Sequence, residues 1–270
     1  MTSQPSWTTP FAPSVEVDGL TDDQSELVEK LSLRLVFQAL AQFATEAGQI
    51  FAQAEDREIE IAQDVTREAL DLYGGFPIRQ RVFGTVDYKA ARWLPTSFGL
   101  VPQALFVDSK AERSQSSCTL QMSQISLPVR QWRAGVVTNE QGTLPQTYDF
   151  SFGGTVCKGI TTVVVVHYRY RISPQEARTL RSICLAAIPN GRLAQQYCPT
   201  ETDHIWNVGR NAPTREERFR VRVGFKQLER KAAWRVQRLT WVNDSFVARW
   251  QDSDPDGSVK RLAVPLDLRP

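Results

Sequence analysis

The stretch VFGTVDYKAARWLPTSFGLVPQALFVDSKA (residues 82–111) decides how we interpret the chain. Asp87 ends one segment of alternating apolar residues, and a second apolar segment further on runs into Asp108, Ser109 and Lys110. If that second segment is a strand, Asp108 and Lys110 project from one face and Ser109 from the other. Two carboxylates and an ammonium that converge suit metal-assisted phosphodiester hydrolysis. The acids hold a hard divalent cation, and the lysine serves the attacking water or the scissile phosphate.

The triplet Asp/Glu-x-Lys has little specificity by itself. It begins at three positions in this chain, namely Asp87, Asp108 and Glu229. Only the middle one follows a strand that looks buried and has an acid at a plausible distance upstream. The alternative is that Asp108 and Lys110 form a salt-bridged strand end that leads into the polar loop of residues 112–117.

A resemblance to a known family favours the nuclease interpretation. GTVDYKAARWLPTSFGLVPQALFVDSKA resembles the active-site region of SfiI-like type II restriction endonucleases, which belong to the PD-(D/E)xK superfamily. The resemblance extends to AQDVTREAL before this run and to PNGRLAQQY and VGRNAPTREERFRVRVGF after it, and it covers roughly residues 25–250. One departure is Val86, where many members have proline. This position shapes the strand end and supplies no ligand.

By matching positions, the resemblance implies a catalytic triad of Asp87, Asp108 and Lys110. Mg²⁺ would be held by Asp87 and Asp108, with the carbonyl of Ser109 completing the ligand set on the same strand end. Lys110 would position or deprotonate the attacking water and stabilise the pentacovalent phosphate. No nucleotide cofactor is implied.

The same resemblance implies the substrate and the assembly. We expect double-strand cleavage of DNA at an interrupted G·C-rich palindrome, with GGCC half-sites around an unread spacer and 3′ overhangs. A homotetramer would hold two DNA copies before it cuts. Symmetric recognition of a palindrome independently requires at least a two-fold dimer.

A second basic stretch is typical of a DNA-reading strand. Arg218, Arg220 and Arg222 alternate with apolar residues, which as a strand places guanidinium groups on one face and an apolar face against the core. Arginine is the commonest reader of guanine in the major groove. Arg220 and Arg222 also match the SfiI-like pattern, whereas Arg218 does not. The alternative is a charged edge strand that discourages aggregation.

Other side chains are candidates for DNA contacts. Arg210 and Arg215 are expected to contact phosphates, and so is Arg92, which we place in the loop between the two catalytic strands. The polar stretch of residues 114–124 can hydrogen-bond base edges and phosphates, with Ser123 and Gln124 as candidates. An ordinary capped helix would explain this stretch equally well.

Charge is distributed unevenly although the net charge is only +2. Residues 16–75 contain fourteen acids and four bases, which gives −10, whereas residues 76–270 contain sixteen acids and twenty-eight bases, which gives +12. The expected active-site stretch and everything after it are therefore basic, as a phosphate-facing surface requires.

Helix signals occupy the first quarter of the chain. Thr21 and Gln24 form a capping box, after which Leu27, Leu31 and Leu35 recur at helical spacing. Val28, Leu40 and Phe43 widen this apolar stripe, which is expected to be core or a subunit contact. A second amphipathic helix is expected over residues 60–73.

Strand signals follow. Residues 159–172 begin as a β-branched run, typical of a strand buried on both faces, in which His167 is expected to be a packed side chain. A helix start at residues 173–176 and a core strand at 182–188 come next. The predicted fold class is α/β, with a mixed central β-sheet flanked by helices and a restriction-endonuclease-like core.

Composition fits this organisation. Hydrophobic residues make up 41% and charged residues 23%, so a single globular domain over residues 21–270 is expected after a flexible arm of residues 1–20. Within the domain we expect a helical part (21–75), a catalytic core (76–190) and a part with DNA-reading and closing strands (191–270).

The chain has no signal-peptide pattern, and no apolar run approaches the ~18 residues of a membrane span. Its four cysteines lack metal-ligand spacing and suit reduced thiols, so a cytoplasmic location is expected.

Two other functions remain open at this point. A structure-selective repair or recombination nuclease would keep the triad but would not need the arginine ladder. A DNA-binding protein without catalysis would make the triad a coincidence.

Overall fold

The computed structural model describes residues 15–54, 57–72, 76–77, 86–111, 116–133, 135–152, 154–173, 178–207, 220–242 and 245–252. Its α-helices are α1 (Asp22–Gln42), α2 (Ala44–Gln53), α3 (Glu58–Asp71), α4 (Ala194–Tyr197) and α5 (Phe225–Lys231). Short 3-10 helices are η1 (Val17–Gly19), η2 (Met122–Gln124), η3 (Gly191–Leu193) and η4 (Ala233–Arg235). The strands are β1 (Phe76–Pro77), β2 (Tyr88–Thr96), β3 (Gly99–Ala111), β4 (Ser117–Gln121), β5 (Pro128–Arg133), β6 (Val136–Gln141), β7 (Thr147–Phe152), β8 (Thr155–Ile172), β9 (Arg178–Ile188), β10 (Trp206–Asn207), β11 (Arg220–Gly224), β12 (Val236–Val242) and β13 (Ser245–Arg249).

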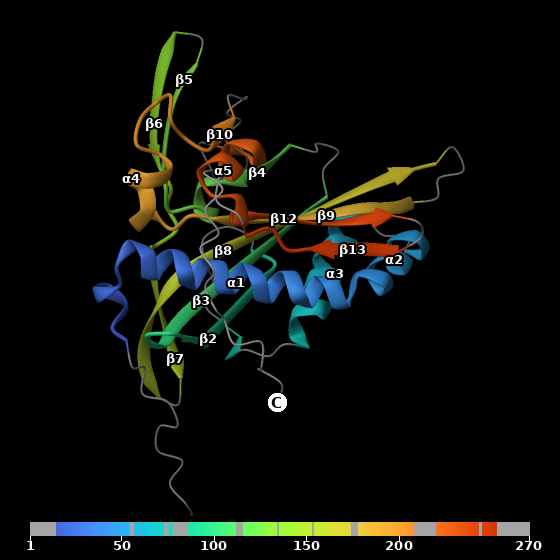
Figure 1. Ribbon diagram of the computed structural model, residues 1–270, viewed down its shortest axis with the longest axis horizontal. Helices are drawn as coiled ribbons and strands as arrows, with labels where there is room; N and C mark the ends of the chain where they lie inside the picture. The colour runs from blue at the N-terminus through green and yellow to red at the C-terminus, as the bar shows by residue number, and fades with distance from the viewer. Residues whose placement is uncertain are drawn as a thin grey trace, which may run out of the picture.

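A mixed sheet forms the centre of the molecule. Its order is β1-β2-β3-β8-β9-β12-β13, with β7 also paired to β8. The pairing of β3 with β8 is parallel and its other described pairings are antiparallel. A three-stranded sheet, β10-β11-β4, and the β5–β6 hairpin lie apart from it, and the hairpin projects from the body (Figure 1). The mixed α/β class predicted from the sequence is confirmed.

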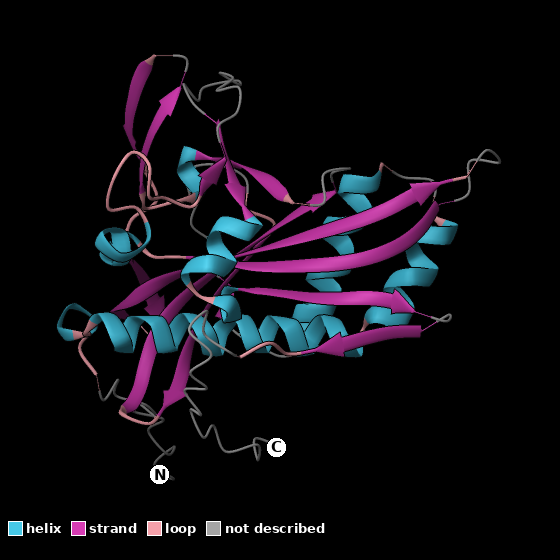
Figure 2. Cartoon of the chain, turned by 45° about the horizontal axis from the view of Figure 1, so that its top comes forward, coloured by secondary structure: helices cyan, strands magenta, loops and turns pink. Residues whose placement is uncertain are grey.

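Different elements cover the two faces of the central sheet. The ring of Tyr168 in β8 stacks on Phe51 of α2, and its hydroxyl lies 2.8 Å from the hydroxyl of Thr66 in α3. The neighbouring His167 points the opposite way, because side chains alternate along a strand, and it meets Phe225 of α5. Helices α1 to α3 therefore lie on one face (Figure 2), and α5 with the small sheet lies on the other.

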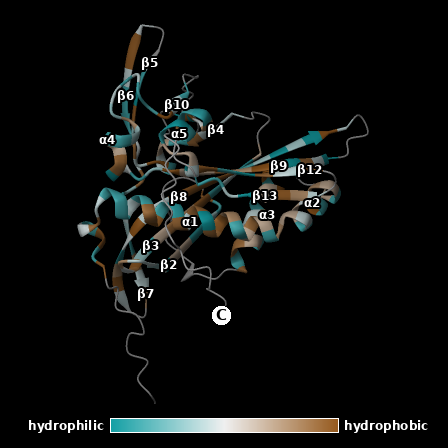
Figure 3. Ribbon diagram, in the orientation of Figure 1, coloured by the Kyte–Doolittle hydropathy of each residue, from teal (hydrophilic) through white to brown (hydrophobic). Residues whose placement is uncertain are grey.

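The core includes β3 and β8, which run side by side in the central sheet (Figure 3). Residues 101–109 of β3 and 159–168 of β8 are buried without interruption, as expected for strands covered on both faces. His167 is 2% exposed, so its predicted role as a packed side chain is confirmed.

Helix α1 begins at the predicted capping box, in which Thr21 and Gln24 exchange hydrogen bonds. Within its predicted apolar stripe, Val28 and Leu40 are buried, whereas Leu27, Leu31 and Leu35 are only half-buried. Leu33 and Val36 complete the buried face. The same buried face also carries polar residues, among them Glu29 and Ser32, which the apolar stripe did not predict.

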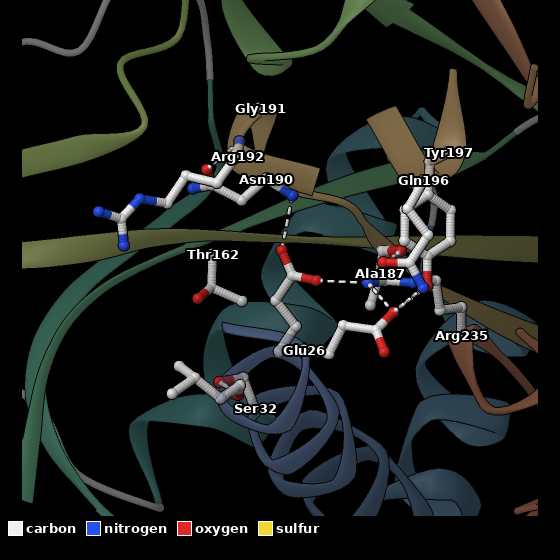
Figure 4. A network of polar contacts seen from close by, with 12 residues as sticks. Glu26, Ser32, Thr162, Ala187, Asn190, Gly191, Arg192, Gln196, Tyr197 and Arg235 are labelled. Atoms are coloured by element: carbon white, nitrogen blue, oxygen red, sulfur yellow. Dashed lines mark hydrogen bonds and ion pairs between the residues drawn. The ribbon is translucent and has the colours of Figure 1, made fainter. Parts of the chain in front are cut away.

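Glu29 is tolerated in the core because a buried arginine compensates it. Arg235 of η4 pairs with Glu29 at 2.6 Å and with Glu26 at 3.2 Å, and Tyr197 also donates to Glu26 (Figure 4). The backbone N–H of Asn190 donates to Glu29 at 2.6 Å. We call Glu26, Glu29 and Arg235 the Arg235 cluster, and it joins α1 to β9 and η4.

Two further expectations from the sequence concern the N-terminal arm and the segment between β8 and β9. Val17 and Leu20, inside the stretch expected to be an arm, are buried beside Val28, and residues 1–14 lie outside the described residues. The helix start expected at residues 173–176 falls mostly outside them too, and β9 already begins at Arg178. No described helix is long and apolar enough to cross a membrane.

Candidate active site

The two acids singled out in the sequence meet across a β-hairpin. The β2–β3 ladder begins with Tyr88 opposite Val107, so Asp87 lies one step before it, level with Asp108. The charge of Asp87 contributes to the raised pKa of Asp108, so the two carboxylates are close in space. The carboxylate of Asp87 accepts a 2.6 Å hydrogen bond from the backbone N–H of Ser109. The predicted convergence of the acids is therefore present in the structure.

Asp108 is held at both of its oxygens. Its Oδ2 pairs with Nζ of Lys110 at 2.7 Å, as strand alternation predicts for residues two apart. Its Oδ1 accepts a 2.9 Å hydrogen bond from Nε2 of Gln124. Asp108 is only 2% exposed, so these groups replace the water that a surface carboxylate would bind. We call Asp87, Asp108 and Lys110 the Asp108 cluster.

Burial sets the protonation of this cluster. It raises the pKa of Asp108 to about 7, with Lys110 opposing the rise and Asp87 adding to it. Burial also raises the pKa of Asp87, against the hydrogen bond from Ser109 and the charge of Lys110. For Lys110 burial alone lowers the pKa, but Asp108 and Asp87 outweigh it and the net pKa is raised. Lys110 is therefore a cation at neutral pH.

Ser109 fixes the end of β3 to helix α3 on the other face of the sheet. Its hydroxyl donates to Thr66 of α3 at 2.8 Å, on the opposite face from Asp108. Thr66 in turn donates to the carbonyl of Ala62 at 2.9 Å and lies 2.8 Å from the hydroxyl of Tyr168. The strand that carries Asp108 is thereby fixed to helix α3 and to strand β8.

The donor set fits a hard divalent cation. Two ionised carboxylates with one ammonium carry a net charge of −1, and burial, the main cause that raises the pKa of both acids, deprives them of the water that would otherwise stabilise this charge. No group of three or more His, Cys, Asp or Glu side chains that could hold a metal occurs in the described parts of the chain. An ion here would need backbone carbonyl, water or phosphate oxygens as well, which is typical of Mg²⁺.

The arginine ladder lies on a strand, as predicted, within the described residues. Val221 and Val223 of β11 are buried, while Arg220 and Arg222 are half-buried on the other face. Arg220 is opposite Gln121 of β4, and Arg222 lies between Thr119 and Asn207. Arginine and neutral hydrogen-bonding side chains thus share one face of the small sheet.

Three of the expected DNA-binding arginines, Arg210, Arg215 and Arg218, lie outside the described residues. The expected loop position of Arg92 was wrong. It lies inside β2 opposite Gln103, and it is 8% exposed. Its guanidinium reaches the hydroxyl of Tyr88 at 3.5 Å, and burial lowers its pKa. Such a buried side chain offers little surface to a phosphate.

Gln124 was considered as a contact to DNA but is buried, at 2% exposure, against Asp108. Its position in a polar stretch of sequence fits either a contact to DNA or a hydrogen bond to Asp108, so the local sequence does not distinguish the two roles. Only the three-dimensional structure brings η2 to the end of β3.

Two solved structures that match this architecture are restriction endonucleases. The crystal structure of tetrameric SfiI bound to cognate DNA matches with a TM-score of 0.80 at 35% identity, covering 89% of this chain and 94% of that one. The crystal structure of BglI bound to its DNA recognition sequence matches with a TM-score of 0.64 at 17% identity, covering 80% and 90%. The second likeness concerns the fold alone. The likeness to SfiI in fold and in sequence thus defines a restriction endonuclease.

Sequence comparison gives the family. The family model for the type II restriction enzyme SfiI matches residues 32–239. The type II restriction enzyme SfiI of Streptomyces fimbriatus is 38% identical over 250 residues, which cover 88% of this chain and 93% of that protein. The chain belongs to the SfiI family of type II restriction enzymes.

Proposed function

We propose that this enzyme cleaves both strands of duplex DNA in a Mg²⁺-dependent reaction at an interrupted, G·C-rich palindrome with GGCC half-sites. The observation that carries the proposal is the convergence of Asp87, Asp108 and Lys110 at one end of the β2–β3 hairpin. Family membership supports the reaction and the type of site. We further propose that the chain forms a single endonuclease domain after an N-terminal arm.

Asp87 and Asp108 would hold the Mg²⁺ ion, with the Ser109 carbonyl as a further ligand. When bound, the ion would polarise the scissile phosphate and lower the pKa of a water molecule. The burial that raises the pKa of Asp108 also makes this carboxylate a stronger electrostatic partner for a cation.

Lys110 would act as a cation and not as the base that removes the proton from water, because its pKa is raised. Its ammonium would donate to a phosphate oxygen as negative charge develops there. Water's oxygen would form the new bond to phosphorus as the bond to the leaving oxygen breaks. The attacking water would give up a proton to solvent, and the leaving oxygen would take up a proton from solvent to become a hydroxyl.

Arg220 and Arg222 would read guanines from the polar face of β11, and Arg210, Arg215 and Arg218 would add contacts to DNA. A palindrome read by one such face per half-site requires at least a dimer. SfiI in its DNA complex is tetrameric, which supports a homotetramer here.

The test is a plasmid digest with Mg²⁺, with and without chelator, beside Lys110→Ala. We expect Mg²⁺-dependent double-strand breaks and a loss of about 10²- to 10³-fold in rate for Lys110→Ala, the range for removing a group that stabilises developing charge. Sequencing the cleaved ends gives the half-sites, spacer and overhang together. Equal cleavage by both proteins would reject the assigned site.

Arg222→Ala separates base reading from general binding to DNA. If Arg222 reads a guanine, discrimination at one base position should fall by about 1–3 kcal/mol, with other positions unchanged. Weakening by the same factor on every sequence would indicate a phosphate contact and would favour a structure-selective nuclease.

A further inference from the structure

Gln124 joins the catalytic acid to the strands that carry the arginines. Its side-chain Nε2 donates to Oδ1 of Asp108 at 2.9 Å, and its Oε1 accepts the backbone N–H of Gln121 at 3.0 Å. Gln121 is the last residue of β4 and lies opposite Arg220 in β11. One planar amide therefore spans the gap between the expected DNA-reading sheet and the expected cation site.

This connection has one defined orientation. Exchanging the oxygen and nitrogen of the amide would set donor against donor at Gln121 and acceptor against acceptor at Asp108. The side chain of Gln121 in turn accepts the backbone N–H of Gln124, so the two glutamines hold each other. The carbonyls of Met122 and Ile125 accept N–H groups of residues 143 and 144 at 2.8 and 3.0 Å, which fixes the segment from its other side.

A shift of β4 would therefore reach the carboxylate of Asp108. Gln124 holds Oδ1 while Lys110 holds Oδ2, so the plane of the carboxylate cannot turn without breaking one of these bonds. The rate of cleavage is sensitive to such a rotation, because misplacing a catalytic group by about 1 Å can reduce the rate about 10²-fold.

We propose that Gln124 is a positioning residue that couples the engagement of DNA by Arg220 to the orientation of Asp108. Correct bases would draw Arg220 and its ladder partner Gln121 into place, and Gln124 would align the carboxylate. Part of the sequence discrimination then arises in the cleavage step and not in binding. This inference rests on the proposed function of Arg220 and Asp108.

A double-mutant cycle tests the coupling. Gln124→Met keeps the side-chain length but removes both hydrogen bonds. The matched control is Gln131→Met, since Gln131 of β5 is also fully buried and its amide has no hydrogen-bond partner among the described residues. Each is combined with Arg220→Lys. The measurements are the single-turnover cleavage rate with Mg²⁺ and the Kd for cognate DNA with Ca²⁺ in place of Mg²⁺.

We expect Gln124→Met to lower the cleavage rate about 10- to 100-fold, as for other groups that orient a ligand of a metal. Its Kd for DNA should stay within about twofold of the wild-type value. Arg220→Lys should slow cleavage in the wild-type and Gln131→Met backgrounds alike, and much less in the Gln124→Met background.

Wild-type cleavage by Gln124→Met, or rate losses that simply multiply with those of Arg220→Lys, would overturn the coupling. If Gln124→Met unfolds, Gln124→Glu replaces it, because the carboxylate still accepts from Gln121 but cannot donate to Asp108 when ionised. A wild-type protein that fails to cut DNA would instead refute the proposed function, so the two failures are distinguishable.

Discussion

Two buried clusters of this molecule contain the same charges and differ in how those charges are satisfied. The Arg235 cluster and the Asp108 cluster each combine two carboxylates with one basic side chain. In the first, a guanidinium pairs with both acids and stacks between the rings of Tyr197 and Trp234, at 4.2 and 4.4 Å. In the second, a single ammonium pairs with Asp108.

The difference follows from the chemistry of the two cations. Arginine presents five donors in a rigid plane and stays charged, so it can saturate two buried carboxylates and fill the space between aromatic rings. Lysine is a compact point charge on a flexible stem. The Asp108 cluster therefore keeps acceptor capacity that a metal ion could use, whereas the Arg235 cluster is closed. We expect function to depend on the first and stability on the second.

The largest effect should come from Asp108→Asn. We expect cleavage to fall by about 10²- to 10³-fold or more, the range seen when a group that stabilises developing charge is removed. The free energy of unfolding should not fall, since the change removes a buried carboxylate whose pKa is raised by burial. Plasmid digestion and urea denaturation measure the two quantities. A large loss of stability would show that Asp108 is mainly structural.

Arg235→Met should give the reverse pattern. It leaves the fully buried Glu29 without its cation, and breaking such a pair destabilises by about 3–5 kcal/mol. Urea denaturation should show this loss, while cleavage per folded molecule stays at the wild-type level. Glu26→Gln is the matched control, because it leaves the Glu29–Arg235 pair intact and should have a smaller effect.

The Mg²⁺ requirement should depend on pH through Asp108. Its pKa is raised to about 7, so the proton is bound increasingly as pH falls below that value and competes with the cation. The Mg²⁺ concentration for half-maximal cleavage should rise about tenfold per pH unit below 7 and level off above it. Titrations at pH 6, 7 and 8 test this. A requirement that does not change over that range would contradict the assigned protonation.

Thr66→Val should have the smallest effect of the four. It removes the Thr66 hydroxyl, which forms hydrogen bonds with the hydroxyls of Ser109 and Tyr168 on the face of β3 opposite Asp108. The loss should be about 1 kcal/mol of stability, because the buried Tyr168 hydroxyl loses that partner. Cleavage should fall only a few-fold. Thermal unfolding beside Ser109→Ala shows which hydroxyl matters more.

Local pattern predicted the parts of the site that lie on one strand. The shared face of Asp108 and Lys110 follows from alternation along β3, and the burial of Val221 and Val223 follows from alternation along β11. The meeting of Asp87 with Asp108 depends on the register of the hairpin, which the sequence indicated only through the family resemblance.

Parts that depend on distant partners were predicted poorly. Arg92 was placed in a loop because the position of the turn was unknown, and β2 in fact continues to Thr96. The apolar stripe predicted for α1 did not include Glu29, which lies on the buried face because its partner Arg235 comes from the far end of the chain. The role of Gln124 beside Asp108 likewise exists only in the folded molecule.

The most direct test of the central comparison is a Mn²⁺-binding titration, followed by electron paramagnetic resonance, on wild type, Asp108→Asn and Glu29→Gln. Each variant loses one buried carboxylate, one from each cluster. We predict that wild type and Glu29→Gln bind the cation with similar affinity and that Asp108→Asn loses this binding while remaining folded. Wild-type binding by Asp108→Asn, or loss of binding by a folded Glu29→Gln, would contradict the account.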